Sequence, residues 1–350
     1  MRVELGPVGY WRHELSHCLH TTAGVLLGFH GLDPVQALGA GWGFDYPAGD
    51  IRREEYYFPG AAEDLFGGLA PFHDVHSRWH EPAGAREGWE QVRAALAAGT
   101  PVAVAADNFH LPFRPAYRDV HTNHLMVLYG FDDTTGDVFV ADPVPPAFQG
   151  TIPLAALGAA RDSGNPVHHD RDLFFTANPI GNRWLEVRIG ERQPAFDPEF
   201  VDRVTAANLR ALRAEPAAAD TAAGHLRGLA GLRTFLTEAF DRLPGDAAVG
   251  DEVFVVIGPV LAVTGLHAEF LREAGRRFGE LRLAELAREV DRVAHHWSAL
   301  RIAVATAGPD RAGAVPGLLR RTAALLDAYD RALEGLQSRL EARGHAPQGA

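Results

Sequence analysis

The sequence contains no lysine, so all 33 of its Lys and Arg side chains are arginines. Because Schiff-base catalysis and the standard phosphate-binding loop both use a lysine amine, neither chemistry is available to this chain. The formal net charge is -12 at pH 7. Broad nucleic-acid binding requires a basic face, so we expect no nucleic-acid partner and favour a neutral or cationic ligand.

Cysteine and long apolar runs are also scarce. The single cysteine, Cys18, cannot form an internal disulfide, which fits a reducing compartment. We find no apolar run of the roughly 18 to 20 residues that a bilayer helix needs, and residues 1–17 lack the features of a signal peptide. A cytoplasmic protein without a membrane partner is therefore expected. The thiol of Cys18 is either an inert packing group or a reactive group.

Composition predicts two domains of the α+β class. The 350 residues are 47% hydrophobic and 22% charged, enough for two cores of ordinary size. Near residue 195, mixed sequence punctuated by proline and glycine gives way to alanine, leucine, arginine and glutamate at helical spacing. We place one domain at residues 1–190 and a helical bundle at 195–345.

Short β-branched or aromatic runs predict strands in the first domain. These runs lie at 102–106, 124–131, 137–142 and 173–177. The polar turn DDTTGD joins the second run to the third, so 124–142 should form an antiparallel hairpin. Amphipathic helices are expected in the second domain at 198–214, 220–243, 252–277, 279–305 and 312–343.

Histidines raise the possibility of a metal site. His13, Glu14 and His17 match the zinc-protease pattern, in which two histidines one helical turn apart hold the ion. The pattern lacks a downstream extension with a third histidine, and no sheet precedes it to support the helix. Zinc binding there remains a distant alternative, and we expect no metal or cofactor. Three histidine pairs are further possible ligands, namely 121 with 124, 168 with 169, and 295 with 296.

Cys18, His124 and Asp142 form the pattern most suited to catalysis. A thiol nucleophile needs an electropositive site, a base and an acceptor that orients the base. Cys18 precedes TTAGVLLGFHGL, an apolar segment of helical period, so its thiol would lie in the first turn of a helix. His124 begins one predicted strand and Asp142 ends the next. The chain order of thiol, imidazole and acid is that of papain-like enzymes.

The hairpin register decides whether this triad can form. Shifting the pairing by one residue would put His124 and Asp142 on opposite faces of the sheet. The residues alone do not determine that register. Cys18 could also be a small buried hydrophobic residue in a helical adaptor without catalytic function.

Two blocks of sequence around these residues resemble a known family, that of butirosin biosynthesis protein H. The first block is His17 and Cys18 with Thr21 and Thr22, followed by HGLDPVQALGAGWGFDY at 30–46. The second is DNFHLPFRPAYRDVHTNHLMVLYGFDD at 107–133, followed by VFVADP. Together they span most of residues 10–145, whereas the C-terminal half resembles the family only in length and helical character.

The resemblance implies a papain-like cysteine-protease-type domain followed by a helical domain. It further implies a cysteine acyltransferase of natural-product (antibiotic) biosynthesis, which moves an aminoacyl or peptidyl group from a carrier-protein thioester to an amine acceptor. Cys18 would be the nucleophile, His124 the base and acid, and Asp142 the orienting group. A thiol peptidase, thioesterase or cyclase would use the same triad.

Six further residues are candidates for contact with the substrate or the triad. His17 directly precedes Cys18, the candidate nucleophile. His121, in the second matching block, is the alternative to His124 as the base. Trp42 and Phe44 follow a helix in GAGWGF, so we expect them to line a turn and to pack on the core or, less often, on substrate. Asp107 and Tyr117 could contact a cationic amine.

Contact with an acidic carrier protein is a further expectation. The arginines considered for it are Arg272, Arg276 and Arg277. A solvated helix face explains the same three residues more simply.

Overall fold

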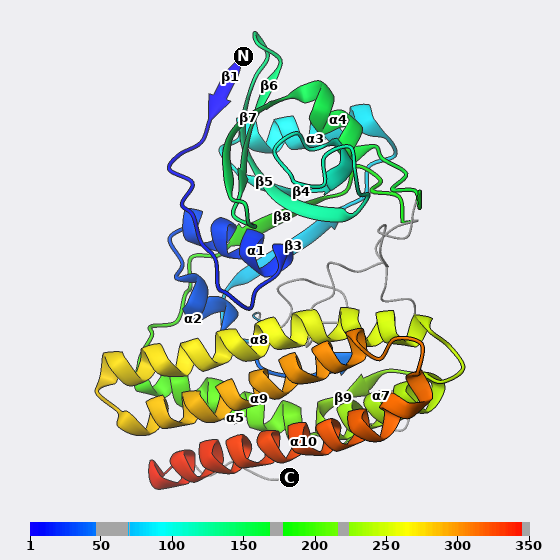
Figure 1. The fold of residues 1–350 in the computed structure, drawn as a ribbon. Helices are drawn as coiled ribbons and strands as arrows, with labels where there is room; N and C mark the ends of the chain where they lie inside the picture. The colour runs from blue at the N-terminus through cyan, green and yellow to red at the C-terminus, as the bar shows by residue number, and fades with distance from the viewer. Residues whose placement is uncertain (47–68, 70, 169–177, 216–223, 345–350) are drawn as a thin grey trace.

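The protein combines an antiparallel sheet at one end with long helices at the other (Figure 1). The computed structural model describes residues 1–46, 69, 71–168, 178–215 and 224–344. Helices α1 (Cys18–Phe29) and α2 (Pro34–Leu38) lie between the sheet and the long helices. The predicted α+β class is confirmed.

Seven strands form the main sheet. They are β1 (Arg2–Glu4), β3 (Val75–His80), β4 (Val102–Asp107), β5 (Asn123–Asp132), β6 (Asp137–Asp142), β7 (Phe148–Pro153) and β8 (Trp184–Ile189). Their order is β3-β8-β4-β5-β6-β7, and β1 pairs with the end of β5. The predicted hairpin is confirmed as β5 and β6, while the predicted strand at 173–177 lies outside the described residues.

Alternating residues of β4 and β5 serve two separate cores, as the twofold period of a strand requires. Ala105, Leu125 and Val127 pack in the same core as α1. Residues of the opposite parity, such as Val104 and Met126, pack in the core beneath α3 (Ala85–Ala97) and α4 (Leu154–Arg161). The central strands are therefore covered on both faces.

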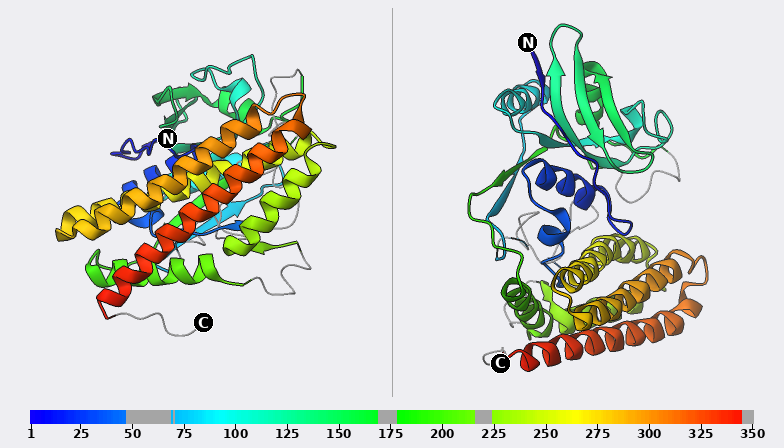
Figure 2. Two further views of the ribbon diagram at one scale, coloured as in Figure 1. Left: turned by 60° about the horizontal axis from the view of Figure 1, so that its bottom comes forward. Right: turned by 90° about the vertical axis from the view of Figure 1, so that its left-hand side faces the viewer.

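Five long helices lie in the described part of the C-terminal region. They are α5 (Pro198–Arg213), α7 (Gly228–Arg242), α8 (Ala248–Phe278), α9 (Leu281–Ala305) and α10 (Arg311–Ala342), of which α8, α9 and α10 run side by side (Figure 2). The predicted helix at 220–243 is wrong at residues 224–227, and its residues 220–223 lie outside the described part of the chain. Leu226 and Arg227 instead form β9, which pairs with β2 (Asp45–Tyr46), and Gly228 with its φ of 62° allows the turn into α7.

This second, two-stranded sheet joins N-terminal residues to the helices. The carbonyl of Phe44 accepts a hydrogen bond from the N–H of Gly228 at 3.0 Å. Helix α8 also contacts α2, and the core that contains α1 continues into the helices. The division into residues 1–190 and 195–345 stays a prediction, and residues 42–46 pack with the second part.

Helix α8 differs from the expectation that the chain has no long apolar run. Among the described residues it is long and apolar enough to cross a membrane, judged by length and composition alone. Yet 83% of its most apolar window is buried inside the protein. Its apolar character is accounted for by this position at the centre of the helical region.

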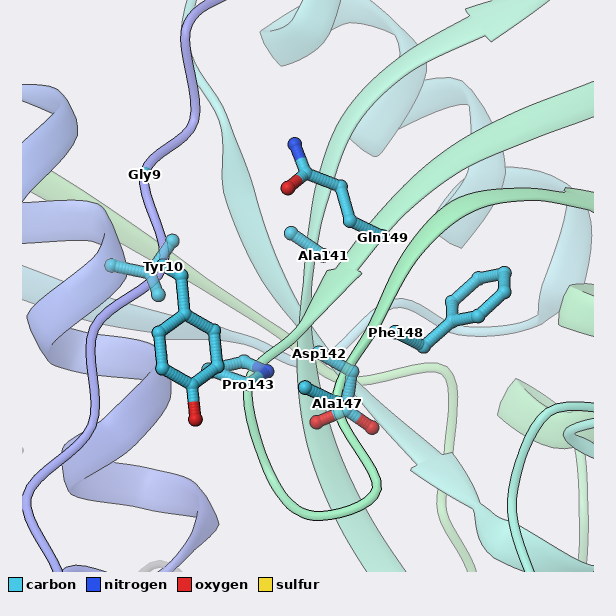
Figure 3. A pocket seen from close by; sticks show the side chains of 9 residues that line it. Gly9, Tyr10, Ala141, Asp142, Pro143, Ala147, Phe148 and Gln149 are labelled. Atoms are coloured by element: carbon cyan, nitrogen blue, oxygen red, sulfur yellow. The ribbon is translucent and has the colours of Figure 1, made fainter.

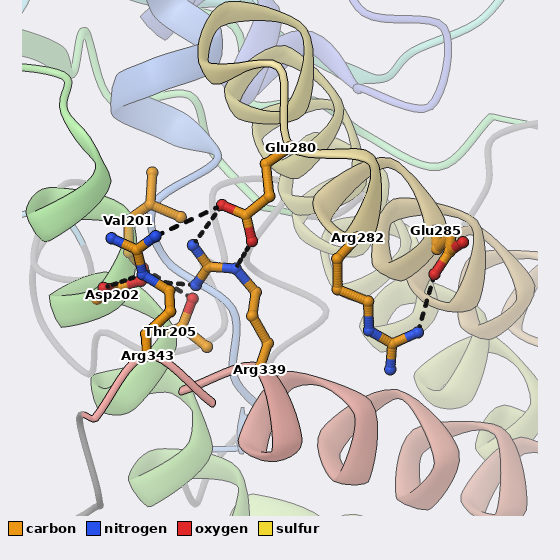
Figure 4. A network of polar contacts seen from close by, with 8 residues as sticks. All are labelled: Val201, Asp202, Thr205, Glu280, Arg282, Glu285, Arg339 and Arg343. Atoms are coloured by element: carbon orange, nitrogen blue, oxygen red, sulfur yellow. Dashed lines mark hydrogen bonds and ion pairs between the residues drawn. The ribbon is translucent and has the colours of Figure 1, made fainter. Parts of the chain in front are cut away.

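A buried charge network ties three helices together (Figure 4). Arg339 on α10 donates to Asp202 of α5 at 2.6 Å and, through two nitrogens, to Glu280 before α9 at 2.6 and 3.0 Å. Arg343 adds a bond to Asp202 at 2.9 Å. Arg339 and Asp202 are only 3% and 2% exposed, so each charge depends on its partners for stabilisation.

Asp202→Asn should lower the free energy of unfolding by about 3 kcal/mol, because it leaves a buried arginine with one carboxylate fewer. Urea unfolding followed by circular dichroism measures this loss. Glu289→Gln, which removes an exposed pair with Arg292, is the matched control and should cost at most about 0.5 kcal/mol. Equal effects of the two substitutions would show that the network does not hold the helices.

Candidate active site

Cys18 is the first residue of α1 and is only 4% exposed. His17 caps the helix, because its Nδ1 accepts the backbone N–H of Leu19 at 3.3 Å. The first turn of α1 contains no acidic residue. The thiol therefore lies at the positive end of a helix dipole, in the kind of position that favours a thiolate.

Buried, neutral histidines surround this helix start. Burial and, to a smaller extent, the charge of Arg301 on α9 lower the pKa of His17 to about 3. Burial also holds the pKa of His20 well below the ordinary value, with His17 and His13 adding to the effect. These imidazoles carry no charge at neutral pH, so they could neither pair with a thiolate as cations nor repel a cationic substrate.

The zinc pattern at His13 and His17 does not form a zinc site. Residues 14 and 15 form a turn and the helix begins only at Cys18, so the two histidines are not one helical turn apart. Each Nδ1 instead accepts a backbone N–H, from Leu15 and Leu19 respectively. Within the described ranges no group of three potential ligands could hold a metal ion, and this includes the described members of the three histidine pairs.

His124 and Asp142 are hydrogen-bonded across the hairpin. The His124 Nε2 lies 2.7 Å from the Asp142 Oδ2, and both residues are buried. Val127 pairs with Ala141 in the hairpin, which places the two side chains on the same face. The register that the sequence left open is thus the one that allows a histidine–aspartate pair.

A β-bulge produces this register. Near the turn, Phe131 pairs with Val138, but the pairing shifts by one residue between Leu128 and Gly130. Without that shift Asp142 would face away from His124. Gly130 is required there because a Cβ would lie 2.3 Å from the carbonyl oxygen of Val3 in β1.

Arg114 completes the surroundings of Asp142 and was not predicted from the sequence. Its Nη1 donates to the Asp142 Oδ2 at 3.2 Å and to the Val144 carbonyl at 2.9 Å, while the N–H of Val144 donates to Oδ1 at 3.0 Å. Burial alone would raise the pKa of Asp142, but His124, Arg114 and the Val144 N–H outweigh it and hold this pKa below its ordinary value. Asp142 is therefore ionised at neutral pH.

Helix α1 brings Cys18 to the start of β5. Thr22, one turn after Cys18, donates its hydroxyl to the Leu125 carbonyl at 3.0 Å, next to His124 in the chain. Val25, almost one turn further, lines a pocket with Ala141 of β6. Helix α1 therefore runs from β5 towards β6. Its N-terminal end, which carries Cys18, lies on the side where β5 begins.

A pocket of about 230 Å³ lies beside Asp142 (Figure 3). Tyr10 and Gly9 of the N-terminal segment form one wall, and residues of β6, β7 and the loop between them form the other. The Nε2 of Gln149 donates to the Val8 carbonyl at 3.3 Å and so joins the two walls. The lining is mainly apolar, which suits an aliphatic or aromatic group.

Trp42 and Phe44 belong to the core of the helical region. Trp42 stacks between His267 and Tyr329, with ring centroids at 5.0 and 5.5 Å, and Phe44 packs on Phe235. Both are at most 3% exposed. The structure therefore favours the packing interpretation of these two aromatics over contact with substrate.

The residues predicted to contact an amine differ in exposure. Asp107 is 0% exposed and already accepts four hydrogen bonds, so it is not available to a substrate ammonium group. His121 binds Asp107 and not Asp142. Tyr117 is 37% exposed and lies beneath the guanidinium of Arg118, so this loop residue remains accessible.

The arginines proposed to meet a carrier protein are engaged within the helical region. Arg272 pairs with Glu269 and Asp291, and Arg276 also pairs with Glu269. Arg277 lies over the ring of Phe196 at 5.4 Å. The interpretation as an ordinary helix face is the one that the structure favours.

Arg114→Gln should destabilise the protein by about 2 kcal/mol at pH 7, because it removes a charged hydrogen bond to a buried carboxylate. This contribution requires ionised Asp142, so it is present above the ordinary aspartate pKa of about 3.9 and is lost as the pH falls through the lower, folded value. Urea unfolding of both proteins between pH 7 and pH 3 measures the difference. Arg86→Gln, at an exposed residue of α3, is the control. If the loss of unfolding free energy caused by Arg114→Gln did not shrink at low pH, the pairing of Arg114 with ionised Asp142 would be contradicted.

Comparison with known protein families adds independent support for this region. Residues 17–143 match the family described as butirosin biosynthesis protein H, N-terminal. No curated protein matches the chain. The match begins one residue before Cys18, ends one residue after Asp142 and contains Arg114 and His124. The match to the butirosin biosynthesis protein H N-terminal family therefore spans the whole candidate triad.

Proposed function

We propose that this protein is a cysteine-dependent acyltransferase of natural-product biosynthesis. In this proposal an aminoacyl or peptidyl group passes from the thioester of a carrier protein to Cys18 and then to an amine acceptor. The observation that carries the proposal is the buried His124–Asp142 pair at the start of β5, next to Leu125, whose carbonyl accepts a hydrogen bond from Thr22 of the helix that begins with Cys18. A papain-like arrangement accounts for that geometry.

The hydrogen bond to Asp142 assigns the roles of the two imidazole nitrogens. Ionised Asp142 accepts the proton on the His124 Nε2, which leaves a lone pair on Nδ1. Nδ1 then takes the thiol proton of Cys18, and the thiolate attacks the thioester carbonyl. The carbon–sulfur bond to the carrier breaks, and the carrier thiolate leaves with the proton from His124.

In the second step an amine attacks the acyl-enzyme. The carbon–nitrogen bond forms, the bond to the Cys18 sulfur breaks, and His124 accepts a proton from the attacking nitrogen. The backbone N–H of Cys18, in the first turn of α1, is the oxyanion donor that we propose for both tetrahedral intermediates. Arg12, six residues before Cys18 in the sequence, is exposed and is not part of this assignment.

The helical region packs against the turn that precedes Cys18. A Cβ on Gly265 of α8 would lie 2.6 Å from the Leu15 side chain and 3.1 Å from that of His13, so α8 packs directly against the turn before Cys18. This packing fixes the position of the helix start. It also keeps water from that side of the thiol, and an acyl-enzyme must be shielded from water if it is to react with an amine.

Acyl-enzyme capture tests the proposal. The protein is incubated with the N-acetylcysteamine thioesters of several amino acids, and intact mass and peptide mapping report any acyl group on Cys18. We expect acylation of the wild type, none in Cys18→Ala, and a rate at least about 100-fold lower in His124→Ala. His76→Ala is the matched control, because His76 is exposed and pairs with Asp74 far from the triad in the sheet order.

The fate of the acyl group on Cys18 distinguishes acyl transfer from the alternative reactions, hydrolysis and cyclisation. Amide formation with added putrescine supports acyl transfer. Hydrolysis at the same rate with and without the amine would point to a thioesterase or peptidase, and release of a ring from a peptidyl thioester would point to a cyclase. No acylation of Cys18 by any donor would contradict the proposal.

A further inference from the structure

Arg301 on α9 has no partner of opposite charge among the described residues. It is half-buried, and its Nε is buried without a hydrogen-bond partner. Its guanidinium lies over the ring of Phe254 on α8, 4.0 Å from the ring centroid. Burial lowers the pKa of Arg301, and no described carboxylate opposes this effect. By contrast, Arg272 and Arg339 each pair with two carboxylates. The aromatic ring offsets only part of the cost of removing a charge from water, so the position suits an anion.

His17 adds a second hydrogen-bond donor that lacks an acceptor. Its Nδ1 accepts the backbone N–H of Leu19, so the proton of the neutral ring is on Nε2. This Nε2 is buried, and no described residue accepts a hydrogen bond from it. The charge of Arg301 contributes to the low pKa of His17, which shows that the two side chains lie within electrostatic reach of each other. One charged and one neutral donor therefore share a region without an acceptor.

The face of α8 beneath Arg301 is the face that also packs against the turn leading into α1. A Cβ on Gly265 would lie 2.6 Å from the side chain of Leu15 in that turn. Phe254 precedes Gly265 by about three helical turns, so the two residues share one face of the helix. Gly258, about one turn after Phe254, lies on the same face, and a Cβ built there would meet no described atom within 4 Å. This face is thus covered at Gly265, whereas the described residues leave it open beside Arg301.

The surroundings favour a phosphate over a carboxylate as the anion. The pocket beside Asp142 is mainly apolar, and the ionised Asp142 in it would repel an acyl chain with a negative charge. Carrier proteins hold their acyl groups on a pantetheine arm, and this arm is attached to the carrier through a phosphate. A guanidinium binds phosphate oxygens through charge-assisted hydrogen bonds. The arm of the donor therefore supplies an anion that suits the helical region.

We propose that Arg301 binds the phosphate of the pantetheine arm of the acyl donor. The inference rests on the proposed acyltransferase function and deepens it, because it names the part of the donor that the helical region recognises. The phosphate gives the half-buried guanidinium a counter-ion and gives the Nε2 of His17 an acceptor. With a formal net charge of -12, the protein as a whole disfavours anions, so one arginine can distinguish a phosphorylated arm from an unphosphorylated one.

The test compares thioesters that differ in one charged group. They are hexanoyl-pantetheine, hexanoyl-4′-phosphopantetheine, and adipoyl-pantetheine, which carries a carboxylate on its acyl chain. Mass spectrometry measures the rate of Cys18 acylation at low donor concentration. The proteins are wild type, Arg301→Gln, Arg301→Lys and, as the matched control, Arg288→Gln at an exposed arginine of the same helix.

We expect Arg301→Gln to lower the acylation rate about 10-fold with the phosphorylated donor, which is the effect of losing one charge-assisted hydrogen bond. The rates with the two other donors should not change. Arg301→Lys keeps the charge and should retain part of the preference for phosphate. Arg288→Gln should match the wild type with every donor. Because Arg301→Gln breaks no ion pair within the described chain, this variant should fold, as circular dichroism can verify.

Calorimetric titration with 4′-phosphopantetheine under reducing conditions gives a readout that does not require acylation. The wild type should bind it about 10-fold more tightly than Arg301→Gln does. Pantetheine without the phosphate should bind equally to both proteins.

Equal losses with the phosphorylated and unphosphorylated hexanoyl donors, or no loss with either, would overturn the inference and leave Arg301 as a structural partner of Phe254. A loss confined to the adipoyl donor would also overturn it, by assigning Arg301 to the acyl chain. Failure of the proposed function has a different signature. No protein would then acquire an acyl group on Cys18, while the titration would still decide whether Arg301 binds the phosphate.

Discussion

The candidate site depends on one hydrogen bond, between His124 and Asp142, and therefore on the strand register that permits this bond. A hairpin with regular pairing from its turn would place the two side chains on opposite faces. The bulge between Leu128 and Gly130 changes the register by one residue, and beside it β1 lies so close to residue 130 that only glycine fits there.

The two halves of the chain meet at the nucleophile. In the proposed mechanism the sheet supplies the base His124 and the orienting Asp142, and α1 supplies the thiol at its first residue, while α8 packs against the turn that leads into α1. Within the helical region, buried Arg339 is paired with Asp202 and Glu280 and so joins α10 to α5 and to the start of α9. Residues 42–46 reinforce the connection through the pairing of β2 with β9.

Local patterns predicted much of this arrangement. The hairpin, the start of α1 at Cys18 and four of the five C-terminal helices follow from period and turn chemistry, and the family match covers the predicted triad. Sequence patterns failed where contacts between distant residues determine the structure. The register depends on a bulge in β5, β9 pairs with the distant strand β2, and Arg114 reaches Asp142 from a loop. The zinc pattern failed because residues 14 and 15 turn where that motif needs a helix.

The most direct test of the central claim is the rate at which iodoacetamide alkylates Cys18 as a function of pH. The account predicts that wild-type Cys18 reacts as a thiolate well below pH 8, and that His124→Ala and Asp142→Ala both lose this reactivity while His76→Ala keeps it. Mass spectrometry of the Cys18 peptide gives each rate. An ordinary thiol profile in the wild type, or a profile unchanged by His124→Ala, would contradict the claim that these residues act as one unit.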